Sequence, residues 1–106
     1  MPAARNRVIA SKGVAVTILT LPETLDRRAV AELSPKLLAL RGAAIVLDAG
    51  SVRKLGTIGF EMLIAARHQW QADGLEIEFR NWSEDAMQAL TRIGASVDML
   101  TGEAGQ

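Results

Sequence analysis

Thr57 is the residue of this chain best placed to take part in chemistry, and it lies in a Gly-Thr-Ile-Gly motif at 56–59. A short apolar, partly β-branched run at 43–47 precedes the motif, and such a run is typical of a central strand covered on both faces. The motif then opens a helix-compatible segment that continues to about Asp73. A hydroxyl near a helix N-terminus can cap free backbone N–H groups, and the same groups and the helix dipole would stabilise a phosphate on that oxygen. Thr57 is therefore either a helix cap or a phosphate acceptor.

Other residues that could do chemistry are isolated from suitable partners. His68 is the one histidine, and with no cysteine in the chain it cannot complete an obvious metal site. Asp48 ends the apolar run, but no acidic partner or catalytic lysine accompanies it, which favours a role in capping or loop organisation. The spacing from Gly56 to Gly59 is too short for a Walker A loop or a dinucleotide fingerprint. We therefore expect no catalytic residue, no metal and no cofactor, and a protein that is not an enzyme.

Composition excludes several other classes of function. Twelve basic and twelve acidic residues cancel, so no net field gathers nucleic-acid phosphates or holds the chain on an anionic membrane. The absence of cysteine excludes a disulfide framework and fits a reducing compartment. No stretch approaches the roughly 20 apolar residues of a membrane span. We expect a cytoplasmic protein that binds no nucleic acid and does not insert into a membrane.

The apolar pattern predicts an α/β fold in the order β-β-α-β-α-β-α. Two strands at 7–11 and 14–19 flank a turn at Lys12-Gly13, and an alternating strand at 75–79 has one wet face, which favours an edge position. Asp26 and Ser83 are good helix caps, and Pro35 predicts a kink or a restart in the first helix. Gly74 and Gly94 suit helix C-termini. The prediction is one domain over 1–106, a mixed sheet of about four strands with helices packed on it and loose ends at 1–6 and 101–106.

Three segments carry a resemblance to a known family. They are the sequence LPETLD at 21–26, IVLD at 45–48 followed by LGTIG at 55–59, and LEIEFRN at 75–81 before the serine cap. In order and spacing the chain resembles the STAS domain, the fold of bacterial anti-sigma-factor antagonists. The resemblance spans most of the chain and implies a single STAS-like domain that binds another protein.

The resemblance assigns a role to each residue of the central motif. In the antagonists this motif is typically Asp-Ser-Ser-Gly, and its first serine is phosphorylated by an anti-sigma factor that is also a kinase. Thr57 falls on that serine, Ile58 on the second serine, Gly59 on the glycine and Gly56 on the aspartate. Only the glycine is identical. The differences remove a carboxylate and a second hydroxyl beside the acceptor.

Two hypotheses for function follow from the resemblance. In the first, the unphosphorylated chain binds an anti-sigma factor with serine/threonine kinase activity, and phosphorylation of Thr57 ends the complex by adding charge to the docking surface. In the second, the chain is a constitutive, unphosphorylated docking subunit of a chemosensory or lipid-transport complex. Both need a contact surface around Thr57, which we call the docking surface and expect to comprise Gly56, Thr57, Ile58, Gly59, Glu61, Asp26, Asn81 and Trp82.

Trp82 is the most unusual member of the predicted docking surface, because it is a large residue in a polar loop before Ser83. It is either a binding anchor of the kind that dominates interface energetics or a packing residue that closes the last helix over the core.

Overall fold

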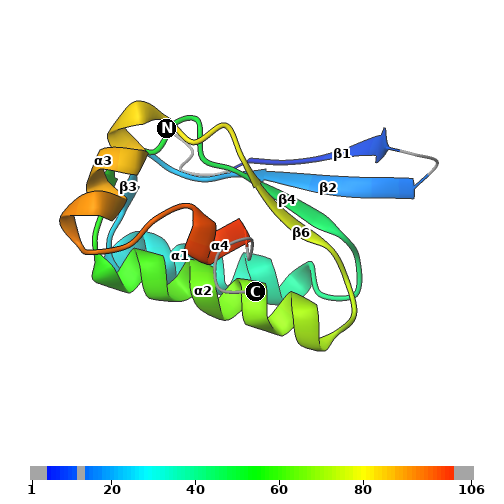
Figure 1. Ribbon diagram of the computed structural model, residues 1–106. Helices are drawn as coiled ribbons and strands as arrows, with labels where there is room; N and C mark the ends of the chain where they lie inside the picture. Colours follow the sequence, from blue (N-terminus) through cyan, green and yellow to red (C-terminus); the bar gives the residue numbers. More distant parts are fainter. Residues whose placement is uncertain (1–4, 12–13, 102–106) are drawn as a thin grey trace.

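A mixed four-stranded sheet forms one layer of the computed structural model, which describes residues 5–11 and 14–101 (Figure 1). Its strand order is β1-β2-β4-β6, with bounds Arg5–Ser11, Val14–Thr20, Ile45–Asp48 and Ile77–Arg80. β1 and β2 are antiparallel, whereas β4 runs parallel to both β2 and β6. The expected turn at residues 12–13 lies outside the described residues. The central place of β4 and the edge place of β6 are confirmed.

The strand register decides which side chains enter the core. Leu19 pairs with Leu47 and Leu47 with Phe79, and all three are buried beneath the helices. Successive side chains of a strand point to opposite faces, so the neighbouring positions Ile18, Val46 and Glu78 lie on the other face. Figure 1 shows α1 and α2 together on the first face of the sheet. The core therefore sits between one face of the sheet and these two helices.

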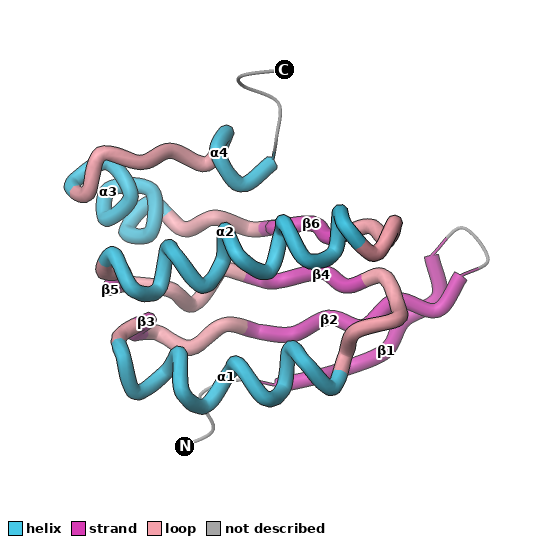
Figure 2. Tube along the Cα trace, turned by 90° about the horizontal axis from the view of Figure 1, so that it is seen from below, coloured by secondary structure: helices cyan, strands magenta, loops and turns pink. Residues whose placement is uncertain are grey.

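In the described part of the chain four helices accompany the sheet: α1 (Arg27–Ala39), α2 (Thr57–Ala72), α3 (Glu84–Arg92) and the short α4 (Asp98–Thr101). α1 and α2 run side by side (Figure 2). The side chain of Asp26 caps α1, that of Ser83 caps α3, and Gly74 and Gly94 have positive φ after α2 and α3, as predicted. A restart at Pro35 is wrong, because α1 continues through that residue.

Three short elements were not predicted. β3 (Thr24–Leu25) and β5 (Lys54–Leu55) form a separate parallel pair, and α4 follows α3. Two-residue strands are too short to show any hydrophobic period, so only their pairing reveals them. β1 begins at Arg5 and α4 ends at Thr101, both inside the stretches expected to be loose; the remainder of those ends, 1–4 and 102–106, lies outside the described residues.

The α2 helix is fixed at both ends. Near its C-terminus the buried ring of Trp70 donates from Nε1 to the carbonyl of Ala43 at 2.8 Å, which satisfies the polar atom of a core aromatic residue. Near its N-terminus Gly59 lies against β3, where a Cβ atom would stand 2.5 Å from the carbonyl oxygen of Leu25. The close approach requires glycine, because backbone cannot move aside as a flexible side chain can.

Gly59→Ala should therefore lower the free energy of unfolding by about 2 kcal/mol, the range of an overpacked core, even though alanine is the better helix former. Urea unfolding measures the change. Gly56→Ser is the matched control, because nothing lies within 4 Å of a Cβ at residue 56 and serine is a good helix cap. The close contact would be unimportant if Gly59→Ala proved as stable as that control.

Candidate functional site

Thr57 is the first residue of α2, and its side chain is exposed. The N-cap is Gly56, whose backbone is extended and whose carbonyl accepts the first helical bond from the Phe60 amide at 3.1 Å. The interpretation of Thr57 as a plain cap is wrong, because it lies one residue inside the helix and α2 has no side-chain cap. Its hydroxyl is thus left at the surface without a capping role.

The β3–β5 pair places the starts of α1 and α2 beside each other. Leu25 pairs with Leu55, both are buried, and the Gly56 amide extends the ladder by a long 3.5 Å bond to the Leu25 carbonyl. The next residue of each strand is the cap of a helix, Asp26 for α1 and Gly56 for α2. The structure therefore brings Asp26 and the Gly-Thr-Ile-Gly motif together, as the docking surface requires.

The two helix starts differ in charge. The Asp26 carboxylate accepts from the Ala29 amide at 3.0 Å and places a negative group at the positive end of the α1 dipole. α2 has neither a side-chain cap nor an acidic residue in its first turn. A negative charge added at Thr57 would meet an uncompensated helix N-terminus, where it is favoured.

The remaining residues of the motif differ in how much they offer a partner. Glu61 on the next turn of α2 is exposed, Ile58 is half-buried, and Gly59 is buried against β3. Thr57 and Glu61 therefore present whole side chains to a partner, while Gly59 serves to hold the start of α2 in place.

Asn81 and Trp82 have structural contacts of their own. Asn81 has a positive φ of 61° and lies beside Gly50. Gly50 belongs to the loop after β4, where its amide donates to the Asp48 carboxylate at 2.8 Å. Trp82 is half-buried and stacks on Phe79 with ring centroids 6.2 Å apart. The stack on Phe79 favours the packing interpretation of Trp82. The contact between Asn81 and Gly50 connects this segment to the loop that leads into β5. The role of Asp48 in loop organisation is also seen here.

No group of three His, Cys, Asp or Glu side chains that could hold a metal occurs among the described residues. His68 is exposed on α2. The site is thus a surface of backbone ends, one hydroxyl at Thr57 and two exposed carboxylates at Asp26 and Glu61, which suits recognition of another molecule.

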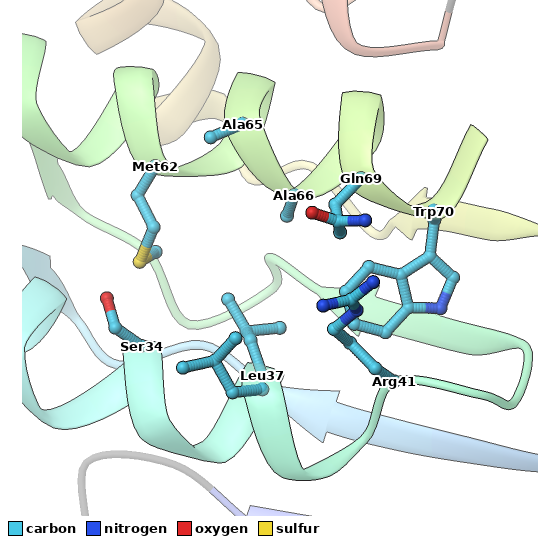
Figure 3. A pocket seen from close by; sticks show the side chains of 9 residues that line it. Ser34, Leu37, Arg41, Met62, Ala65, Ala66, Gln69 and Trp70 are labelled. Carbon is cyan, nitrogen blue, oxygen red and sulfur yellow. The ribbon is translucent and has the colours of Figure 1, made fainter. Parts of the chain in front are cut away.

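A second surface feature was not predicted from the sequence. A hollow of about 230 Å³ lies between α1 and α2 (Figure 3). Arg41 closes one end through a paired contact with Asp73, and this hydrogen bonding lowers the pKa of the Asp73 carboxyl and raises that of Arg41. Leu38 is the residue of the sequence that could have indicated this hollow, because it is a large apolar side chain on α1 that the structure leaves 65% exposed. The hollow is lined by Ser34, Leu37, Leu38, Arg41, Met62, Ala65, Ala66, Gln69 and Trp70.

Comparison with known proteins identifies the family. A family model described as "Mlab, STAS domain" matches residues 9–101, so the chain belongs to the STAS domain family. Among twelve matching chains of solved structures, one titled "Crystal Structure Analysis of Mglu" superimposes with a TM-score of 0.61 at 21% identity. The match covers 74% of this chain and 19% of that one, so it supports the fold alone, and this chain spans about a fifth of that protein. No curated protein matches.

Family membership confirms the mixed α/β fold and establishes the general class of function, a regulatory and protein-interaction module of a generally non-catalytic kind. Among the described residues, no helix is both long and apolar enough to cross a bilayer.

Trp82→Ala should lower the free energy of unfolding by about 2 to 3 kcal/mol, because it removes the stack on Phe79 and leaves a void at the core edge. Thermal and urea unfolding measure it. Trp82→Phe keeps a ring on Phe79 and removes the buried Nε1, which has no partner, so it should stay within about 1 kcal/mol of wild type. A stable Trp82→Ala variant would instead favour the anchor interpretation.

Proposed function

We propose that this protein is a non-enzymatic docking module that binds another protein through the docking surface around Thr57, in a complex that phosphorylation of Thr57 breaks. The observation that supports it most directly is the exposed hydroxyl of Thr57 at the start of α2, a helix with no side-chain cap, at the position that the resemblance to the antagonists aligns with their phosphorylated serine. The other described features offer no comparable chemistry.

The switch follows from charge and desolvation. Unmodified Thr57 is small and neutral, so a partner can pack closely against it and the neighbouring backbone. A phosphate adds about −1.5 to −2 charges and three strongly solvated oxygens at the same point. The close-packed complex must then either bury that charge or open, and burial of an unpaired charge is the costlier outcome. The phosphorylated form dissociates.

The partner in this proposal is an anti-sigma factor with serine/threonine kinase activity, held by the unphosphorylated chain so that a sigma factor is released. The class of partner comes from the family resemblance, in which the kinase both binds the motif and modifies it. Threonine is a competent acceptor, and no residue crowds the space that a Cβ at Gly56 would occupy. A kinase can thus approach Thr57 from the Gly56 side.

A second candidate is favoured by the residues on either side of Thr57. Gly56 brings no carboxylate to the acceptor, and Ile58 brings an apolar, half-buried side chain instead of a second hydroxyl. A constitutive subunit of a chemosensory or lipid-transport complex needs neither group. In that case the same surface holds the partner permanently, and Thr57 is a packing contact without modification.

Thr57→Glu should abolish or strongly weaken partner capture, whereas Thr57→Ala should preserve it, because only the first substitution introduces charge into the contact. The measurement is affinity purification from native lysate with wild type and both variants in parallel, with captured proteins identified by mass spectrometry. The same samples are searched for phosphothreonine at residue 57.

Thr91→Glu is the matched control, because it adds the same charge to an exposed threonine on α3, away from the motif. Recovery of a kinase-like anti-sigma factor by wild type, Thr57→Ala and Thr91→Glu, but not by Thr57→Glu, supports the switch. Equal recovery of transporter or chemosensory components by all four proteins supports the constitutive subunit. Equal recovery of the kinase by all four would contradict a docking surface centred on Thr57.

A further inference from the structure

The hydroxyl of Ser83 makes two hydrogen bonds in different directions. Its oxygen accepts from the Ala86 amide at 3.0 Å and so caps α3. Its O–H donates to the carbonyl of Val52 at 2.5 Å, across 31 positions of sequence. A plain helix cap needs only the first bond. The second joins the first turn of α3 to the loop that enters β5 and then Thr57.

The loop that receives this bond is well ordered by other contacts. The side chain of Val52 is fully buried, and the amides of Arg53 and Lys54 both donate to the Glu23 carbonyl, at 2.8 and 3.0 Å. Glu23 immediately precedes β3. The loop is thus held between β3 on one side and α3 on the other.

The only other polar link from α3 to this loop among the described residues is the ion pair between Arg53 and Asp85, at 3.6 Å. Both side chains are more than half exposed, and exposed ion pairs contribute little to stability. The bond from Ser83 is part-buried and therefore the stronger connection.

We infer that Ser83 is a positioning residue for residues 54–57, which we call the docking segment. Its cap function holds α3, and its donor function fixes the Val52 carbonyl, so the start of α2 and the first turn of α3 form one rigid unit. The inference rests on the proposed function for its purpose, since a segment held in place before binding loses less conformational freedom when a partner docks. The bond itself can be tested without a partner.

The test separates the two functions of one hydroxyl. Ser83→Asp keeps an acceptor for the Ala86 amide but has no hydrogen to donate to Val52, whereas Ser83→Thr keeps both functions. Amide hydrogen exchange followed by NMR on the purified full chain gives a rate for each residue. In Ser83→Asp we expect the Arg53 and Lys54 amides to exchange about three to ten times faster, the range for one lost hydrogen bond.

Two internal references make the result specific. Leu63 in the middle of α2 and Leu90 in α3, both fully buried, should change less than the loop amides. Ser83→Thr should restore wild-type rates. Thr91→Val is the matched control, because it removes a similar hydroxyl bond, from Thr91 to the Met87 carbonyl, within the same helix and away from the loop.

The inference is overturned if Arg53 and Lys54 exchange at wild-type rates in Ser83→Asp, if all amides speed up together with Leu63, or if Thr91→Val has the same effect on the loop. If the Leu90 amide exchanges faster in Ser83→Asp, α3 itself is frayed in that variant, and the comparison is made with Ser83→Gly instead. Glycine caps helices with only a small loss of stability and also lacks the hydroxyl donor. Failure of Thr57→Glu to release a partner would contradict the proposed function and leave these exchange rates unaffected.

Discussion

The contact between Gly59 and the carbonyl of Leu25 fixes where α2 begins, and most of the docking surface depends on it. A methyl group at residue 59 would stand 2.5 Å from that oxygen, so only glycine lets the first turn of α2 lie against β3. The two-residue pair of β3 and β5 then sets Asp26 and Gly56 as neighbouring helix caps.

Where the starts of α1 and α2 pack together, the Thr57 side chain remains exposed at the surface. Gly56 takes the cap position with its backbone alone, and α1 is capped by its own aspartate. The start of α2 therefore retains its partial positive charge and has one hydroxyl at the surface. This combination fits a contact that is neutral when a partner is bound and unfavourable for close packing once a phosphate is attached.

The surrounding loops give this surface its rigidity. Ser83, Glu23 and Asp48 each use a hydrogen bond to tie a loop at the carboxyl edge of the sheet, and Trp82 covers the core edge beside them. A preordered surface suits both the switched and the constitutive complex, because either one gains affinity when little ordering remains to be done on binding. The difference between them lies in the residues beside Thr57, where Gly56 and Ile58 replace the carboxylate and second hydroxyl of the antagonists.

Local patterns in the sequence determined the central strand before Thr57, the edge strand at β6, the caps Asp26 and Ser83, and the glycines that end α2 and α3. Each depends on residues within a few positions of one another, where periodicity and backbone preferences decide. Tertiary structure alone decided that Gly56 and not Thr57 caps α2, that β3 pairs with β5, that a hollow lies between α1 and α2, and that Ser83 reaches Val52. These features arise when segments far apart in sequence approach closely, and packing distances of that kind leave no periodic trace along a single chain.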